Sequence, residues 1–326
     1  MTSVEADRQT ADPELGPVLG RGFGHGKVIL VGEHAVVYGH AALAVGISTG
    51  ISVEARIGTG RLQVPAWKLE ATTGDDTPVG RALAAIVGRM EAPLLDFLAD
   101  AQIPSRAGLG SSAALAVAIA RAAAVATGRA SASDTIDAAV AEAEAIFHGD
   151  PSGIDAAAAK SGAAGTFTRA GGWGPVPVLQ AMTLCIGFSG RPRDTAAQVA
   201  AVRRLRERLP AAGDVLALLG RLADDASSAL GKGDVDGLGR ILDAAHGLLA
   251  ALRLSSPELE ALVHGARAAG AVGAKLTGAG GGGAVIALAP GHERDVLARW
   301  RAAGYEGFVA QIAAAPGGRA ATGGRA

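Results

Sequence analysis

Two glycines and two serines stand directly before a long apolar run, and this pattern is typical of a loop that binds phosphate. Gly108 and Gly110 have no Cβ, so the backbone there can turn tightly and approach a ligand closely. Ser111 or Ser112 is expected to cap the helix that follows. The first N–H groups of a helix have no partner within it, and with the positive end of the helix dipole they attract an anion. Residues 104–114 therefore predict either a phosphate site or a plain helix cap.

Neither of two common phosphate motifs explains this loop. A Walker A loop needs a lysine before the helix-starting serine, where this chain has Gly110. The spacing Gly108-x-Gly110-x-x-Ala113 matches a dinucleotide fingerprint, but only a short strand would fit before it, and the first acid after it, Asp134, belongs to another helix start. The glycine string at 278–283 matches too, yet a strand follows it instead of a helix. A nicotinamide-dependent oxidoreductase is therefore disfavoured.

Three further stretches carry titratable side chains where a site could form. Glu33 and His34 directly follow an apolar, strand-like run, although a hairpin with its polar residues in water would give the same pattern. Glu144 belongs to an acidic helix, most of whose acids are expected on a solvated face. Asp155 follows the helix-breaking string at 151–153, so it could either serve a reaction or cap the next helix.

A mixture of strands and helices must position these residues. Apolar and β-rich runs predict strands at 27–31, 43–57, 183–188, 273–277, 284–289 and 308–312. Helical spacing predicts helices at 78–90, 115–126, 133–147, 156–160, 195–209, 214–230, 234–252, 256–269 and 293–302. The segment 61–76 indicates only strand fragments and loop. The order of elements after residue 182 predicts an α+β domain with an antiparallel sheet.

Composition and charge exclude several classes of protein. Of the 326 residues, 49% are hydrophobic but only 3% are aromatic, so the core must consist of Ala, Val, Leu and Ile. A formal net charge of −1 gives no electrostatic footprint for nucleic acid or for an anionic membrane. The single cysteine, Cys185, excludes an internal disulfide, and its apolar neighbours indicate a buried thiol. No apolar run is long enough to span a bilayer and no secretory signal is recognisable, so we expect a cytoplasmic protein.

Three strings in order resemble the motifs of the GHMP family of small-molecule kinases. They are Gly26–Gly39, Gly108–Ala114 and Lys275–Gly283, and together they cover most of the chain. Within the family, the segments 32–39 and 148–155 are most similar to those of mevalonate kinases. One departure is an arginine at position 106, where the family loop usually has glycine.

The resemblance implies a two-domain α+β fold. A mixed α/β domain would cover residues 20–180 and hold the phosphate loop. A ferredoxin-like antiparallel sheet with helices would cover residues 181–314. Residues 1–19 and 315–326 would form flexible tails, as their composition also indicates.

The resemblance also implies roles for individual residues. Asp155 would accept the proton of the acceptor hydroxyl, with Lys27 beside it to stabilise developing charge. Ser112 and Glu144 would bind Mg²⁺, which prefers oxygen ligands. Nucleotide binding would involve Arg106, Ala107, Gly108, Leu109, Gly110, Ser111, Ser112 and Ala113. The acceptor would contact Lys27, Glu33, His34, Asp155, Thr195 and Gly280.

The resemblance implies the ATP- and Mg²⁺-dependent phosphorylation of the 5-hydroxyl of mevalonate. A homodimer is compatible with the sequence. A phosphomevalonate kinase would need further cationic side chains near the acceptor, and the segments around His34 and Thr195 offer only Arg191 and Arg193. A relative that binds a metabolite without catalysis is the third alternative, and the presence of Lys27, Glu144 and Asp155 argues against it.

Overall fold

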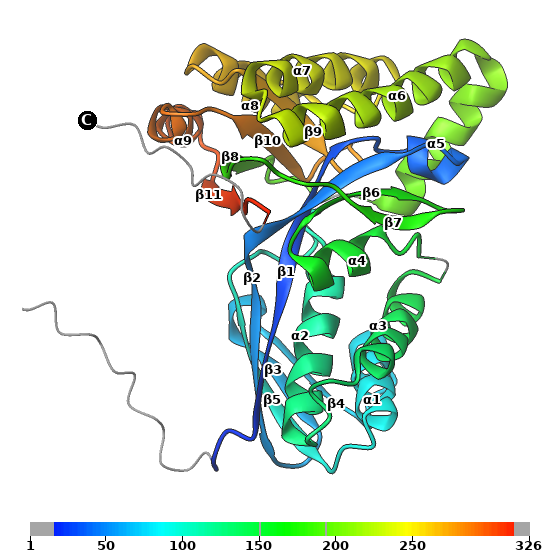
Figure 1. Ribbon diagram of the computed structural model, residues 1–326, viewed down its shortest axis with the longest axis vertical. Helices are drawn as coiled ribbons and strands as arrows, with labels where there is room; N and C mark the ends of the chain where they lie inside the picture. The colour runs from blue at the N-terminus through cyan, green and yellow to red at the C-terminus, as the bar shows by residue number, and fades with distance from the viewer. Residues whose placement is uncertain (1–15, 150, 193, 316–326) are drawn as a thin grey trace, which may run out of the picture.

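Two β-sheets, one after the other along the chain, form the frame of the molecule (Figure 1). The computed structural model describes residues 16–149, 151–192 and 194–315. Most of the expected tails, 1–19 and 315–326, lies outside these residues. The strands are β1 (Gly20–Val31), β2 (Ala42–Ile57), β3 (Arg61–Val64), β4 (Leu69–Thr72), β5 (Leu95–Ala101), β6 (Ala164–Thr168), β7 (Gly172–Pro175), β8 (Met182–Phe188), β9 (Gly273–Thr277), β10 (Ala284–Leu288) and β11 (Gly307–Ile312).

Helices pack against both sheets. Two short 3₁₀ helices, η1 (Ala35–Tyr38) and η2 (Pro65–Trp67), follow β1 and β3. The α-helices are α1 (Pro78–Arg89), α2 (Ser111–Ala126), α3 (Ser133–His148), α4 (Ile154–Ser161), α5 (Thr195–Arg208), α6 (Ala211–Lys232), α7 (Val235–Ala251), α8 (Pro257–Ala268) and α9 (Glu293–Ala302). Within the part of the chain that the structure describes, no helix is both long and apolar enough to cross a membrane.

The first sheet has seven strands in the order β4-β3-β5-β2-β6-β7, with β1 also paired to β2. Neighbouring strands are antiparallel except for β3 and β5. Because β5, the strand before the phosphate loop, runs antiparallel to β2, the sheet is not the parallel sheet of a dinucleotide-binding fold. α2 contacts β1 and β2, and α3 and α1 pack outside it (Figure 1).

Alternate glycines on β1 allow α2 to lie directly on the strand. A Cβ at Gly20, Gly22 or Gly24 would overlap a backbone carbonyl of α2. Those carbonyls belong to residues 122, 118 and 114, which lie about one helical turn apart. Every second residue of the strand therefore faces every fourth residue of the helix. The close approach explains why the buried side of this helix consists largely of alanine.

The second sheet is antiparallel throughout, in the order β11-β8-β10-β9. The chain passes from β8 through four helices to β9, then through β10 and α9 to β11, which is a ferredoxin-like arrangement with extra helices after its first strand. The predicted α+β fold is therefore confirmed. The two sheets meet where β1 contacts β9 and where β2 contacts β11.

Most predicted elements form within a few residues of their expected bounds, but β1 begins at Gly20, well before the predicted start at residue 27. Further features also differ. β6 and β7 were not predicted, because they are short and contain glycines. The segment after β1 contains the 3₁₀ helix η1 instead of a hairpin. Neither Ser111 nor Ser112 caps α2: Gly110 takes the cap position in a left-handed conformation, with no side-chain hydrogen bond.

Candidate active site

An open cavity of about 650 Å³ lies where the two sheets meet. Its walls come from β1 and η1, from the segment between α3 and α4, from α5, and from the turn after β9. Six of the residues predicted from the sequence line this cavity, namely Lys27, Glu33, His34, Glu144, Asp155 and Thr195. Gly280 and residues 106–113 are not among its lining residues.

Lys27 and Asp155 form an ion pair on the cavity wall. Lys27 Nζ lies 3.0 Å from Asp155 Oδ1, with the lysine side chain 3% exposed and the aspartate 27% exposed. Lys27 is a residue of the strand β1. Asp155 lies in the first turn of α4, where the helix dipole favours a carboxylate. Gly153, not Asp155, takes the cap position of α4. The carboxylate is thus held by the lysine and stays accessible from the cavity.

The phosphate loop meets the cavity through Lys27. A Cβ at Gly110 would come 2.8 Å from Cγ of Lys27, so the absence of a side chain there lets the lysine pass beside the loop. Gly108 and Gly110 have φ angles of 92° and 68°. Arg106 also lies in the left-handed region, with φ of 60°, which explains why glycine is favoured at this position and shows that this chain accepts a strained arginine there.

Glu144 is a buried carboxyl group close to the ion pair. It is 3% exposed, and its Oε1 has no hydrogen-bond partner. Burial, and next the negative charge of Asp155, raise the pKa of Glu144 to about 7, against the opposing effects of a hydrogen bond from Ser112 and of the Lys27 charge. Ser112 Oγ also lies 3.1 Å from Nε2 of His148. A buried carboxylate oxygen without a donor, next to a hydroxyl group, suits a hard divalent cation.

Apart from Lys27 and Asp155, the acceptor residues predicted from the sequence come from the turn after β1, from α5 and from the turn after β9. His34 is 5% exposed, and its Nε2 donates a hydrogen bond of 2.9 Å to the carbonyl oxygen of Ala279. Glu33 is 1% exposed and forms an ion pair with the fully buried Lys275. Thr195 begins α5 and is exposed at the cavity. The backbone of Gly280 instead packs against the carbonyl group of Leu254.

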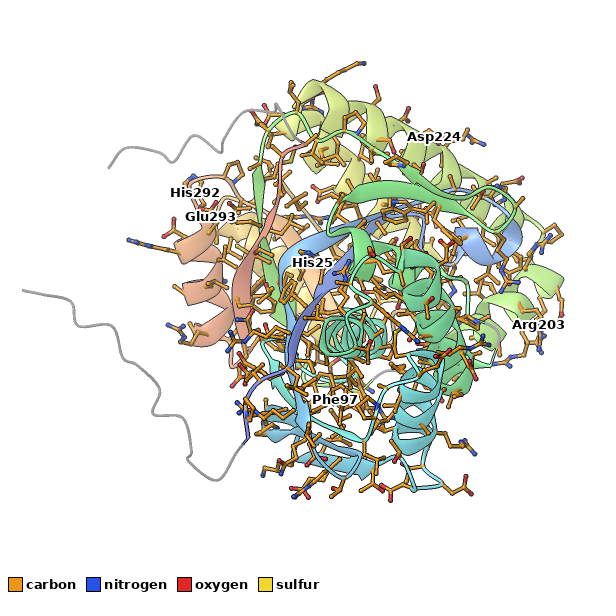
Figure 2. The ribbon with its side chains drawn as sticks, turned by 60° about the horizontal axis from the view of Figure 1, so that its bottom comes forward. His25, Phe97, Arg203, Asp224, His292 and Glu293 are labelled. Carbon is orange, nitrogen blue, oxygen red and sulfur yellow. The ribbon has the colours of Figure 1, made fainter. Side chains whose placement is uncertain are left out.

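Two arginines at the cavity were not predicted. Arg169, between β6 and β7, and Arg203, on α5, both line it, and Figure 2 shows Arg203 at the outer edge of the molecule. Of the two arginines that the sequence offered near the acceptor segments, Arg191 pairs with Glu258, and Arg193 lies outside the described residues. The spacing of Thr195, Val199 and Arg203 places them on one helical face, a signal that was available in the sequence.

Cys185 and residues 280–283 of the glycine turn do not line the cavity. Cys185 is fully buried, as predicted, and burial raises the pKa of its thiol to about 12. The glycine turn at 278–283 joins β9 to β10 and packs on the segment after β8, where Gly283 and Arg191 are joined by a backbone hydrogen bond of 3.1 Å. Among the described residues, no cluster of three or more His, Cys, Asp and Glu side chains could hold a metal ion alone. A cation here would need ligands from a substrate as well.

The chain matches two family models. Residues 78–163 match the GHMP kinases N terminal domain, and residues 226–306 match GHMP kinases C terminal. The sequence is 35% identical over 314 residues to a mevalonate kinase of Pyrococcus horikoshii, with 88% of this chain and 93% of that protein covered. It is 38% identical over 286 residues to a mevalonate kinase of Aeropyrum pernix, with 81% and 86% covered.

A solved structure agrees with these relatives. The crystal structure of L. major mevalonate kinase in complex with R-mevalonate superimposes with a TM-score of 0.81. The match covers 94% of this chain and 99% of that chain, at 28% sequence identity. Fold and sequence therefore agree over nearly the whole length.

Proposed function

Because this chain belongs to the GHMP kinase family, we propose that it transfers the γ-phosphoryl group of ATP to the 5-hydroxyl of mevalonate. The products would be 5-phosphomevalonate and ADP. Relatives at 35% and 38% identity that carry the name mevalonate kinase support this acceptor. We place the reaction in the cytoplasm, where ATP is available.

The ion pair of Lys27 and Asp155 carries this proposal. Asp155 accepts the proton of the 5-hydroxyl as the oxygen attacks the γ-phosphorus. The Lys27 ammonium group, 3.0 Å from that carboxylate, lies beside the phosphate loop and stabilises negative charge on the phosphoryl oxygens during transfer. Because the lysine is buried and held by β1, it needs no rearrangement when the charge develops.

The phosphate loop and Glu144 would hold the nucleotide and its cation. The first N–H groups of α2, beyond Gly108 and Gly110, donate to the phosphates. Glu144 and Ser112 fit a Mg²⁺ ion, because one carboxylate and one hydroxyl leave the remaining ligand positions to phosphate oxygens and water. When bound, the ion neutralises charge on the β- and γ-phosphates.

Residues from η1, from α5 and from the segment between β6 and β7 would orient the acceptor. His34 and Thr195 offer polar atoms to the cavity, and Arg169 and Arg203, whose side chains are exposed, offer positive charge. A guanidinium group matches a carboxylate in shape and charge, so these arginines would bind the carboxylate of mevalonate. The acceptor would then lie with its anionic end outward and its 5-hydroxyl at Asp155.

The same two arginines favour phosphomevalonate as a second candidate acceptor. A phosphorylated acceptor needs cationic groups close by, and Arg169 and Arg203 are two such groups that the sequence did not predict. The relatives named mevalonate kinase favour the unphosphorylated acceptor. Direct comparison of the two acceptors separates these functions.

Replacing Asp155 by asparagine tests the proposed mechanism. Asp155→Asn keeps the shape of the side chain and removes the proton acceptor, so turnover should fall by about 10²–10⁴-fold. Binding of MgATP, measured by calorimetry, should stay near the wild-type value, because the carboxylate faces the acceptor. Lys27→Met should lower turnover as well, and the double variant should lose much less than the product of the two effects.

Asp137→Asn is the matched control. Asp137 pairs with Lys160 at 2.6 Å, so this variant also removes an aspartate–lysine pair, but at the surface of α3. It should keep full activity. Near-normal turnover of Asp155→Asn, together with a lower melting temperature, would instead assign Asp155 a purely structural role.

A further inference from the structure

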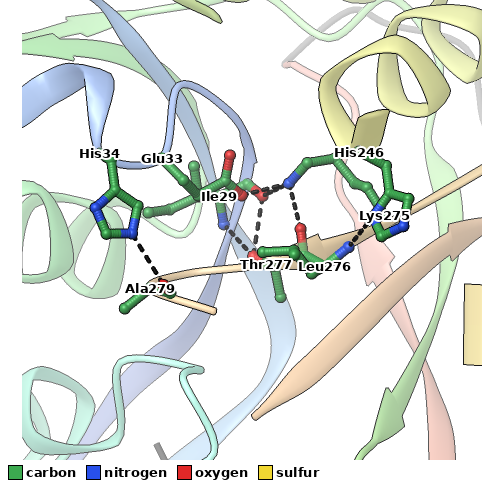
Figure 3. A network of polar contacts seen from close by, with 8 residues as sticks. All are labelled: Ile29, Glu33, His34, His246, Lys275, Leu276, Thr277 and Ala279. Atoms are coloured by element: carbon green, nitrogen blue, oxygen red, sulfur yellow. Dashed lines mark hydrogen bonds and ion pairs between the residues drawn. The ribbon is translucent and has the colours of Figure 1, made fainter. Parts of the chain in front are cut away.

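A fully buried lysine on β9 joins the second sheet to β1 and to the turn that follows β1. Lys275 lies on β9 and is 0% exposed. Its ammonium group donates to Oε1 of Glu33, to the carbonyl oxygen of Leu276, and to that of Ile29 at 3.5 Å (Figure 3). These are as many acceptors as an ammonium group has N–H bonds, so the lysine is fully satisfied.

The partner of this lysine belongs to a strained turn. Glu33 immediately precedes His34, whose φ of 59° lies in the left-handed region. Such a conformation in a residue other than glycine persists only when its surroundings hold it. One contact is visible in Figure 3, where His34 Nε2 donates to the carbonyl oxygen of Ala279, two residues beyond β9. Glu33 is in turn held by its ion pair with Lys275, so β9 and the turn after it contact both residues.

Hydrogen bonds other than the ion pair also join the two sheets. Thr277 Oγ1 accepts a hydrogen bond from the N–H of Ile29 and donates one to its carbonyl oxygen, each at 3.0 Å. These contacts already fix β9 on β1. A buried ion pair adds little net stability compared with apolar side chains of the same size, because both charges lose their hydration. The pair of Glu33 and Lys275 therefore calls for another explanation.

We propose that Lys275 is a positioning residue for the acceptor. It acts through Glu33 to hold the turn, so that the His34 ring keeps its place on the cavity wall. Glu33 then orients His34 instead of contacting the acceptor itself, which its 1% exposure supports. This inference rests on the proposed function, since the acceptor is that of the proposed reaction.

The test replaces both charges together. Lys275→Met alone would leave Glu33 buried without a partner, so the informative variant is Glu33→Gln with Lys275→Met. The KM for mevalonate should rise by about 10- to 100-fold, since displacement of a group by about 1 Å costs up to about 10²-fold. The KM for ATP and the melting temperature should stay close to the wild-type values.

A background without the His34 ring separates positioning from direct contact. In His34→Ala, the same double replacement should raise the KM for mevalonate much less than in the wild type, because its effect passes through His34. Full additivity of the two effects would overturn the proposal.

Thr277→Val is the matched control at the same interface. It removes two hydrogen bonds between β9 and β1, so it should lower the melting temperature and leave the KM for mevalonate nearly unchanged. The proposal is overturned if the double replacement behaves like Thr277→Val. Absence of mevalonate turnover in the wild type would overturn the proposed function and this inference together, whereas an active wild type with an unchanged KM in the double variant overturns the inference alone.

Discussion

Glu144 shows at the residue scale how burying a carboxyl group lowers the stability of the folded chain. Its carboxyl group is buried with an unpartnered oxygen, and burial is the main reason that its pKa rises to about 7. A bound cation would add positive charge to that of Lys27 and would favour the ionised carboxylate. The group therefore favours the folded chain most when it is protonated.

The pH dependence of stability tests this reading of Glu144. Between its usual pKa near 4.5 and its folded value near 7, the folded state binds more protons than the unfolded state. Stability should then fall as pH rises through this window, by about 1.4 kcal/mol per pH unit and on the order of 3 kcal/mol in all. Glu144→Gln removes the titration, so its melting temperature relative to the wild type should increase from pH 5 to pH 8.

The measurement is thermal unfolding with EDTA present. In a second series without EDTA, Mg²⁺ and ATP should stabilise the wild type more at pH 8 than at pH 5 and should stabilise Glu144→Gln much less. Parallel melting curves for the two proteins across this pH range would show that Glu144 is not buried as a carboxyl group of raised pKa.

Sequence motifs identified some charged residues of the cavity and missed two arginines that line it as well. Lys27, Glu144 and Asp155 stand in local strings, so their place could be predicted without the fold. Arg169 and Arg203 come from a short edge hairpin and from a helix with only one buried residue, and neither segment carries a motif. Their convergence on one cavity depends on how the two sheets meet, which no local pattern contains.

At the scale of elements, the contact of β1 with α2 positions the reaction site. The helix begins at the proposed phosphate loop and the strand carries Lys27, so the separation of strand and helix sets the distance between that loop and the lysine. The glycines of β1 make this separation small. The sequence predicted both elements, but the matching of Gly20, Gly22 and Gly24 to the turns of α2 is a tertiary feature.

Gly22→Ala tests this contact. The new Cβ would overlap the carbonyl oxygen of Ala118, so α2 must move away from the strand. We expect a loss of about 1–3 kcal/mol of stability, typical of overpacking, and a lower affinity for MgATP because the helix start shifts with it. Urea denaturation and nucleotide titration measure the two effects.

Gly88→Ala is the control for Gly22→Ala. It also adds one methyl group, but on α1, where no atom lies within 4 Å of the new Cβ. Alanine in a helix should raise stability by about 0.5–1 kcal/mol. Equal effects of the two substitutions would mean that β1 and α2 are not in close contact.

At the scale of the whole molecule, the site exists only because the two sheets meet. The first sheet and its helices supply the phosphate loop, Lys27 and Asp155, while the second half of the chain supplies α5 and the turn after β9. The bounds of the expected domains, 20–180 and 181–314, stay a prediction, although the change from one sheet to the other falls between β7 and β8.

Arg203→Ala tests whether the mouth of the cavity selects an anionic acceptor. A hydrogen bond to a charged group contributes about 1.5–3 kcal/mol, so the KM for mevalonate should rise by about tenfold or more while the KM for ATP is unchanged. Arg204→Ala is the matched control, because Arg204 is the exposed residue next to Arg203 on α5 and does not line the cavity. An equal effect of both variants would indicate a general influence of surface charge.

The identity of the acceptor is the central claim, and ³¹P NMR of the reaction products tests it most directly. The purified chain is incubated with ATP and Mg²⁺ and with mevalonate, 5-phosphomevalonate, homoserine or galactose in separate samples. We predict a new phosphomonoester signal with mevalonate, matched by stoichiometric ADP and lost in Asp155→Asn. A diphosphate signal with 5-phosphomevalonate, and no product with mevalonate, would contradict the account.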